Sequence, residues 1–216
     1  MTVHTDMQAY YAQRAATYAE LYARPERQAD LAQLQRRVGE LLAGQKVLEL
    51  ACGTGYWTSA IAATASHVLA TDIAPEMLDV ARTRGLEADK VTFAIGDANA
   101  PPQSIDCTAC LAGHWWSHVA RSRQPAFLDT LRDALQPQAQ LVLIDNVYVE
   151  GSSTPIARTD AEGNTYQIRR LPDGERHEVL KNFPTDSNLR KRLADHLKDI
   201  RIERLEYFWI LSARFK

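Results

Sequence analysis

A short apolar run that opens into two glycines is the segment best suited to hold a ligand. It reads Val47-Leu-Glu-Leu-Ala-Cys-Gly-Thr-Gly-Tyr-Trp57. Glycine has no side chain, so such a loop lets the backbone approach a ligand closely. Only Thr54 separates Gly53 from Gly55, whereas the dinucleotide fingerprint has two residues between its last glycines, which disfavours a dehydrogenase. Glu49, just before the loop, would repel a pyrophosphate and attract an amine.

Two further carboxylates follow the next apolar runs. Asp72 comes 17 residues after Gly55, which suits an acidic residue that accepts hydrogen bonds from ribose hydroxyls. Asp97 follows the third run and is placed to accept from an exocyclic amine. Together with Glu49, these acids describe a nucleoside that has a cationic or amino-bearing tail and no phosphate.

The combination of these motifs resembles the class I S-adenosylmethionine-dependent methyltransferases. The resemblance rests on Glu49-Leu-Ala-Cys-Gly-Thr-Gly55, Thr71-Asp-Ile-Ala-Pro-Glu-Met-Leu78 and Gly96-Asp-Ala98, and it extends over residues 44–147. It implies S-adenosyl-L-methionine as cofactor and S-adenosyl-L-homocysteine as product. The implied contacts are Glu49, Gly53, Thr54 and Gly55 at the methionine portion, Asp72 at the ribose, Ile73 and Met77 around the adenine, Asp97 and Ala98 at its edge, and Ala51 and Trp57 nearby. Family members often have glycine where Ala51 stands.

The loop after the fourth predicted strand, Ala112-Gly-His-Trp-Trp-Ser-His-Val119, is the candidate reaction site. Histidine titrates near neutral pH, so His118 or His114 is a candidate general base. By family position His118 resembles a histidine often found in this loop, whereas His114 lies nearer the cofactor and is also a candidate cofactor contact. Trp115 and Trp116 are candidates to wall the acceptor or to cover the sulfonium through cation–π contact. Alternatively, one histidine caps the next helix and one tryptophan belongs to the core.

The run Ile144-Asp-Asn-Val147 resembles the Asp-Asn pair of metal-dependent catechol-type methyltransferases. Those enzymes also need a carboxylate near the position of Gly113, and magnesium prefers such oxygen ligands, so no metal is predicted. Asp145 is a candidate contact for a polar or cationic acceptor, with a strand-end hydrogen bond as the alternative. The chain has no Asn/Asp-Pro-Pro-Tyr run here, which disfavours DNA and protein-glutamine substrates.

Segments on both sides of the cofactor motifs are candidates to enclose the acceptor. The tyrosine-rich start resembles the opening helices of small-molecule methyltransferases, where Tyr11, Arg14 or Tyr18 would reach the methionine carboxylate or the acceptor; the alternative is a helix laid on the sheet edge. Residues 151–184 are predicted to be an insertion, with Tyr166 and Arg169 as candidate acceptor contacts. The alternative for this insertion is a solvated hairpin that adds an edge to the sheet. Arg169 and Lys181 suit an acidic substrate, although a solvated charged face is the more frequent explanation of such residues.

Alternating strands and helices must position these residues. Strands are expected at 46–50, 68–71, 91–95, 105–111 and 140–147, with helices between them, as in a parallel sheet covered on both faces. Helices are expected over 6–23, from 31 to 42 and over 187–199, a hairpin over 166–183, and last strands over 200–206 and 207–215. By resemblance the fold is an α/β Rossmann-like, doubly wound sheet of seven strands, mostly parallel with an antiparallel last strand. One domain over 1–216 would comprise a helical cover (1–43), a cofactor-binding core (44–150), an insertion or lid (151–184), and a last helix with closing strands (185–216).

Composition narrows the class of protein without naming an activity. The 216 residues are 45% hydrophobic and 24% charged, with a net charge of −2, so no basic nucleic-acid or membrane surface is indicated. Three cysteines favour a reducing compartment, and no leader or apolar span is apparent, so a cytoplasmic protein is expected. The predicted activity is methyl transfer by in-line displacement to an oxygen, nitrogen or carbon of a small molecule. The alternatives are methylation of a macromolecule and a non-catalytic cofactor-binding protein; the oligomeric state is left open.

Overall fold

A seven-stranded sheet forms the centre of the computed structural model, which describes residues 3–103 and 105–216. Its strand order is β10-β11-β6-β5-β2-β3-β4. Five of its strands are parallel: β2 (Lys46–Leu50), β3 (His67–Asp72), β4 (Val91–Ile95), β5 (Ala109–Gly113) and β6 (Gln140–Asn146). The last strand, β11 (Phe208–Phe215), runs antiparallel to both β6 and β10 (Leu197–Arg204). The predicted mostly parallel sheet with an antiparallel last strand is confirmed.

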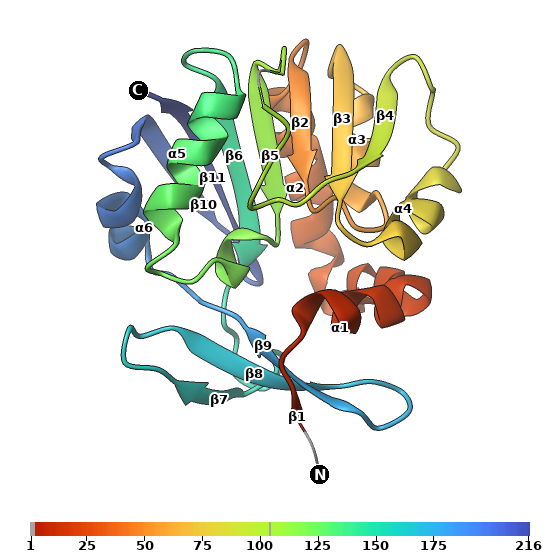
Figure 1. The fold of residues 1–216 in the computed structure, drawn as a ribbon, viewed down its shortest axis with the longest axis vertical. Helices are drawn as coiled ribbons and strands as arrows, with labels where there is room; N and C mark the ends of the chain where they lie inside the picture. The colour runs from red at the N-terminus through yellow and green to blue at the C-terminus, as the bar shows by residue number, and fades with distance from the viewer. Residues whose placement is uncertain (1–2, 104) are drawn as a thin grey trace.

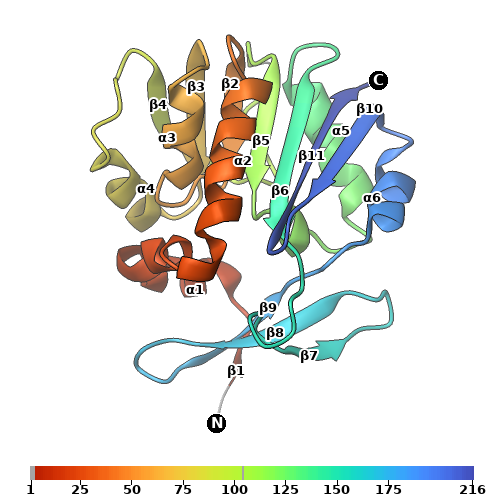
Figure 2. The ribbon, with the colours of Figure 1, turned by 180° about the vertical axis from the view of Figure 1, so that it is seen from behind.

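Helices cover both faces of this sheet (Figures 1 and 2). On one face, α2 (Gln28–Leu41), α3 (Tyr56–Ala62) and α4 (Pro75–Arg82) bury leucines and isoleucine against the strands. On the other face, α5 (Gln124–Ala134) and α6 (Asp186–Leu193) pack around Leu48, Leu143 and Trp209. Burying an apolar stripe of each helix against the apolar strands supplies the main stabilisation of this core.

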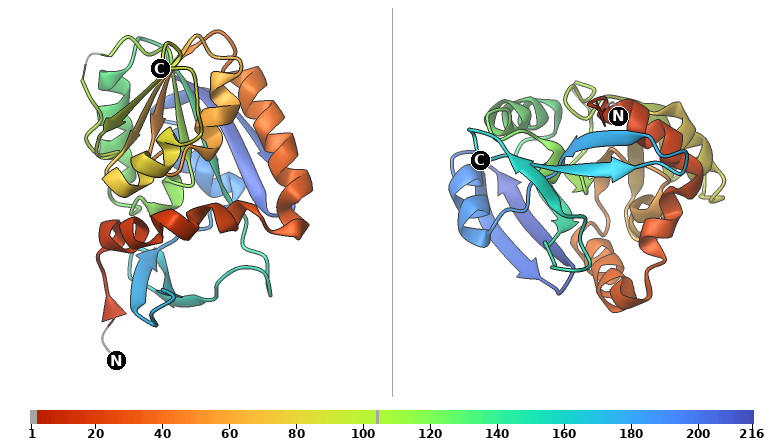
Figure 3. Two further views of the ribbon diagram at one scale, coloured as in Figure 1. Left: turned by 90° about the vertical axis from the view of Figure 1, so that its right-hand side faces the viewer. Right: turned by 90° about the horizontal axis from the view of Figure 1, so that it is seen from below.

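A second, four-stranded sheet lies beyond the end of the main sheet and was not predicted. It has the order β1-β9-β8-β7, from β1 (Val3–His4), β7 (Ile156–Thr159), β8 (Thr165–Arg170) and β9 (Arg176–Leu180). Figures 1 and 3 show α1 (Met7–Arg14) between the two sheets. The predicted hairpin exists as β8 and β9, but it pairs with β1 and β7 and does not extend the main sheet.

The N-terminal segment continues from α1 into a 3₁₀ helix, η1 (Ala15–Tyr22), followed by a second short one, η2 (Pro25–Arg27). The single helix expected over 6–23 therefore changes type at Ala15. Asp6 caps its start by accepting a hydrogen bond from the Ala9 amide at 3.0 Å. The N-terminal segment formed by α1, η1 and η2 lies over the carboxyl ends of the parallel strands of the main sheet (Figures 1 and 3).

Two predicted boundaries are wrong. The fourth strand begins at Ala109 and not at 105, because the amide of Ile105 bonds to the Ala134 carbonyl at the end of α5. The helix expected over 187–199 ends at Leu193, because Leu197 already pairs with Phe215 in the sheet. Within residues 3–103 and 105–216, no helix is long and apolar enough to cross a membrane.

Candidate active site

Two adjoining cavities lie at the carboxyl ends of the main strands. The first, of about 230 Å³, is bounded by residues that directly follow β2, β3, β4 and β5, among them Gly53, Asp72, Asp97 and His114. We call it the acidic cavity, because its described walls include two carboxylates and neither lysine nor arginine. Parallel strands end at the same edge of a sheet, which is where open α/β folds bind ligands.

Asp72 is the best-anchored carboxylate of the acidic cavity. One of its oxygens accepts from the Gly53 amide at 2.8 Å, and the other accepts from the Ala74 amide at 2.9 Å. Burial raises the pKa of Asp72, and these backbone amides oppose the rise. The carboxylate thus fixes the glycine loop against the end of β3 while it faces the cavity.

The remaining walls of the acidic cavity suit a flat, partly apolar nucleoside. Ile73, Met77 and Ala98 provide apolar surface, and Asp97 holds the following turn by accepting from the Asn99 amide at 2.8 Å. Ala51 also lines the cavity and adopts a left-handed backbone conformation with φ of 49°, which glycine adopts without strain. The positive φ at Ala51 agrees with the glycine that family members often have at this position.

The second cavity, of about 320 Å³, lies beside the first and carries the opposite charge. Its described walls include five arginines and one lysine and no aspartate or glutamate: Arg14, Arg24, Arg27, Arg169, Arg170 and Lys181. We call it the basic cavity. Tyr11, Tyr18, His114 and His118 line both cavities and form the partition between them.

Comparison with known proteins supports a common origin with methyltransferases. Residues 47–138 match the family model described as a methyltransferase domain. Over 167 residues the chain is 32% identical to the ubiquinone biosynthesis O-methyltransferase of Xylella fastidiosa, covering 74% of this chain and 64% of that protein. It is 32% identical over 154 residues to the malonyl-[acyl-carrier protein] O-methyltransferase of Serratia marcescens, covering 68% and 54%. The chain therefore spans somewhat less than two thirds of the length of these relatives.

Solved structures extend the similarity across almost the whole chain. The DhpI–SAH complex is 28% identical, superposes with a TM-score of 0.77, and the match covers 96% of this chain and 94% of that one. The complex of DhpI with SAM and HEP gives a TM-score of 0.76 at the same identity, with 95% and 94% covered. The chain belongs to the class I S-adenosylmethionine-dependent methyltransferases. S-adenosylmethionine is its cofactor, and the acidic cavity fits that cation in charge and in the placement of Asp72.

Four of the predicted cofactor contacts of this methyltransferase line neither cavity. Glu49 points away, toward Thr58, whose hydroxyl donates to it at 2.6 Å, and burial raises the pKa of Glu49 to about 8. Thr54 and Gly55 belong to the glycine loop but do not line the cavity, and Trp57, in α3, is buried with its ring edge-to-face against Tyr56. The sequence pattern does not distinguish the loop residues that line the cavity from those that do not.

The basic cavity contains one cation that is neutralised inside the protein. Lys181 and Asp145 are both buried, and the ammonium donates to the carboxylate at 2.6 Å. Asp145 also accepts from the amides of Ser117 at 2.9 Å and Asn146 at 2.8 Å. Although burial alone would raise it, the pKa of Asp145 lies well below its usual value because Lys181 is adjacent. The carboxylate predicted to contact a cationic acceptor is therefore occupied by the protein's own lysine.

His118 belongs to a directed chain of hydrogen bonds. Its Nδ1 faces the Leu180 carbonyl at 2.6 Å, and a carbonyl only accepts, so Nδ1 carries the proton. Its Nε2 therefore accepts from the Tyr11 hydroxyl at 3.0 Å, and Arg169 donates to the same hydroxyl at 2.9 Å. Burial, with the positive charges of Lys181 and Arg169, holds the pKa of His118 well below its usual value. The imidazole is neutral at physiological pH.

His114 lies between the cavities on a strained piece of backbone, with φ of 59°. Its Nδ1 is 3.8 Å from Asp145, beyond hydrogen-bond distance, and burial lowers its pKa. Trp115 lines the acidic cavity. A Cβ at the preceding Gly113 would lie 2.7 Å from Trp57, so no larger residue fits there without movement.

Two predicted acceptor contacts lie elsewhere. Trp116 is in the hydrophobic core, against Phe127, as the alternative for one tryptophan of this loop anticipated. Tyr166 lines neither cavity; its ring lies under the Arg158 guanidinium at 3.6 Å, and its hydroxyl donates to Asp160. In contrast, Tyr11, Tyr18, Arg14 and Arg169 meet in the basic cavity although up to 158 residues separate them. Among the described residues, no group of three or more histidine, cysteine or acidic side chains is arranged to hold a metal ion.

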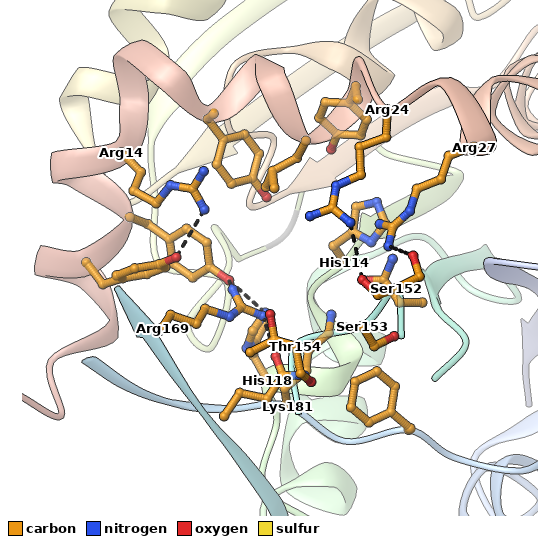
Figure 4. Close-up of a pocket in the computed structure, with 18 of the residues that line it drawn as sticks. Arg14, Arg24, Arg27, His114, His118, Ser152, Ser153, Thr154, Arg169 and Lys181 are labelled. Atoms are coloured by element: carbon orange, nitrogen blue, oxygen red, sulfur yellow. Dashed lines mark hydrogen bonds between the residues drawn. The ribbon is translucent and has the colours of Figure 1, made fainter. Parts of the chain in front are cut away.

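Sequence reasoning did not identify Arg24, Arg27 or Ser152 as site residues. Both arginines line the basic cavity and donate to Ser152, Arg24 to the carbonyl at 3.2 Å and Arg27 to the hydroxyl at 3.1 Å. Figure 4 shows these side chains together at one side of the cavity. Two cations near the start of a helix are usually solvated, so the sequence carries no signal for this contact.

Proposed function

We propose that this chain transfers a methyl group to an anionic oxygen of a small molecule held in the basic cavity. The observation that carries the proposal is the charge of that cavity. Its described walls include five arginines and one lysine; Asp145 pairs with Lys181, and the exposed Glu26 pairs with Arg24. Guanidinium groups bind carboxylates and phosphate-type oxygens through paired, charge-assisted hydrogen bonds. A cavity of this size accepts a small molecule.

An anionic oxygen also agrees with the state of His118. A carboxylate or phosphate-type oxygen is already a nucleophile at neutral pH, so its methylation needs no general base. His118 Nε2 is engaged by Tyr11, and the low pKa of the imidazole makes it a weak proton acceptor. We assign His118 the role of holding Tyr11, which in turn meets Arg169 at the wall shared by both cavities.

The residues of this chain would then act by binding, orientation and exclusion of water. S-adenosylmethionine supplies an electrophilic methyl group on a sulfonium. Asp72, Asp97, Ile73 and Met77 would hold the nucleoside, and the partition of Tyr11, Tyr18, His114 and His118 would align the acceptor oxygen with the methyl group. Alignment of two bound reactants removes much of the entropic barrier to a bimolecular step.

Both relatives described above are O-methyltransferases, which supports oxygen as the methylated atom. They differ in acceptor: one name refers to ubiquinone biosynthesis and the other to a malonyl group. A malonyl group carries a carboxylate, which suits the basic cavity. A ubiquinone precursor is a phenol and offers no negative charge of comparable strength for six cations.

A labelled-methyl assay tests the proposal. The protein is incubated with methyl-labelled S-adenosylmethionine and one of four acceptors: butyrate, propylphosphonate, catechol or propylamine. We expect methyl esters of the two anions. Label in catechol or propylamine alone would refute an anionic acceptor. Arg169→Gln should reduce ester formation, whereas Arg36→Gln, an exposed arginine on α2 outside both cavities, serves as the matched control.

A further inference from the structure

The basic cavity has cations at two separate places. Figure 4 shows Arg14 and Arg169 on one side, and Arg24, Arg27 and Ser152 on the other. The first group adjoins Tyr11 and His118 in the partition with the acidic cavity, through the bond from Arg169 to Tyr11. None of Arg24, Arg27 and Ser152 lines the acidic cavity. Arg14 and Arg169 do not line it either, so the two groups differ in where they meet the partition: the first at Tyr11, and the second beside His114.

Arg27 is the central residue of this second group. Its Nε is buried and makes no hydrogen bond within the described structure. Its guanidinium lies 5.5 Å from the Tyr207 ring centre and 5.9 Å from that of Phe208, which shields it from water. Burial, and then the adjacent charge of Arg24, lower the pKa of Arg27. Arg27 is half-buried, and a cation whose buried donor makes no hydrogen bond is stabilised by an anion placed against it.

The surroundings of Arg27 supply further donors and little competing charge. Ser152 and Ser153 contribute to the cavity wall from the segment 147–155 between β6 and β7. The carboxylate that pairs with Arg24, at 3.9 Å, belongs to the exposed Glu26. An exposed pair of this kind is weak, so it leaves most of the positive potential in place.

We propose that Arg24, Arg27 and Ser152 form a second anion subsite, so that the acceptor carries two negatively charged groups at opposite ends. This inference rests on the proposed function, which supplies the first anionic group of the acceptor: the one that is methylated, next to Tyr11. The acceptor's second anionic group, a carboxylate or a phosphate-type anion, binds at Arg27 and sets the length and orientation of the acceptor. Pairing both ends of the cavity requires a small dianion, because a single small anion meets only one of the two cation groups.

Direct binding measurements test the subsite independently of turnover. The protein with S-adenosylhomocysteine is titrated calorimetrically with two matched pairs: butyrate against succinate, and propylphosphonate against 3-phosphonopropionate. Within each pair the two molecules have nearly equal length and differ by one added carboxylate. The group that both members share is a carboxylate in the first pair and a phosphonate in the second. We expect each two-ended anion to bind about tenfold more tightly, as one charge-assisted hydrogen-bonded contact implies. Equal affinity within both pairs would overturn the subsite without any variant.

Variants then locate the effect. Arg27→Gln, and separately Arg24→Gln, should remove the advantage of the two-ended anions while leaving butyrate and propylphosphonate unchanged. Arg36→Gln should leave every affinity unchanged. Loss of affinity for all four anions in Arg27→Gln, with an unaltered melting temperature, would mean that Arg27 only tethers Ser152 and would refute the subsite. Ser152→Ala tests that tether directly and should weaken only the two-ended anions.

The methyl-transfer assay separates this inference from the proposed function. Arg27-dependent binding of succinate or 3-phosphonopropionate without methyl transfer to any anion would leave the subsite standing and refute the proposed activity. Methylation of one-ended and two-ended anions with equal KM would support the proposed activity and refute the subsite. Support for both requires a KM about tenfold lower for a two-ended anion, and loss of that difference in Arg27→Gln.

Discussion

The two cavities of this methyltransferase differ in charge and in the parts of the chain that build them. The acidic cavity is formed mainly by residues that follow consecutive strands of the main sheet, with Asp72 and Asp97 at its wall. The basic cavity gathers residues from the N-terminal helices, from segment 147–155 and from the second sheet. The charge of the acidic cavity suits a sulfonium cofactor, and that of the basic cavity suits the anionic acceptor proposed above.

The difference shows how the fold divides two tasks. The sheet edge is rigid and recurs in related folds, which fits a cofactor shared by many enzymes. The walls of the basic cavity come from segments added around that edge, which fits an acceptor that varies among relatives. Only the partition of Tyr11, Tyr18, His114 and His118 belongs to both cavities. Mutations should therefore affect one ligand at a time, except at the partition.

The largest effect is expected on the free energy of unfolding, at the buried ion pair between Lys181 and Asp145 beside the basic cavity. Lys181→Met leaves Asp145 buried without its cation, and loss of one partner of a buried ion pair costs about 3–5 kcal/mol of unfolding free energy. Urea unfolding measures the loss. Lys181→Met combined with Asp145→Asn should recover part of it. Equal stability of the wild type and Lys181→Met would show that the pair contributes nothing.

That loss should depend on pH. In the wild type the depressed pKa of Asp145 stabilises the fold above the unfolded value of about 3.9, and this contribution is lost as the pH falls through the folded pKa. In Lys181→Met, burial without the cation raises the pKa of Asp145, so the variant loses stability as the pH rises. The difference between the two proteins should therefore grow between about pH 4 and pH 7.

A change at the acidic cavity should affect the cofactor alone. Asp72→Ala removes the acceptor for the Gly53 and Ala74 amides and should weaken S-adenosylhomocysteine binding about 100-fold, measured by calorimetry. Affinity of the basic cavity for succinate should change little. Asp79→Asn, an exposed carboxylate on α4, is the matched control. Equal cofactor affinity in Asp72→Ala would remove Asp72 from the binding site.

A smaller and opposite effect is expected at the basic cavity. Arg169→Gln removes a cation that lines the cavity and donates to Tyr11, and it should raise the KM for an anionic acceptor about tenfold. The affinity for S-adenosylhomocysteine should stay within about twofold, because Arg169 lies outside the acidic cavity. A matching loss of cofactor affinity would show that the two cavities are not independent.

The sequence predicts the acidic cavity better than the basic one for a physical reason. Gly53, Asp72 and Asp97 each follow an apolar strand, and parallel strands bring such positions together. Arg27 and Ser152 meet across 125 residues of chain, and Arg169 meets Tyr11 across 158, with no periodicity to indicate it. The strand β7 escaped prediction because all four of its residues are exposed and show no alternation. Asp145 was predicted to contact a polar or cationic acceptor or to make a strand-end hydrogen bond, but its partner Lys181 lies 36 residues away and was not foreseen.

The smallest effect is expected at the partition, where a general base and a positioning residue predict different outcomes. If His118 only holds Tyr11, then His118→Ala should lower kcat/KM less than tenfold and mainly through KM, and Tyr11→Phe should give the same change. A general base would lose about 100-fold or more in kcat. With butyrate as acceptor, whose carboxylate is ionised throughout, the wild-type rate should also stay constant from about pH 7 to 8, because burial lowers the pKa of both His118 and His114 and keeps them neutral there. A rate that rises through this range would restore the general base.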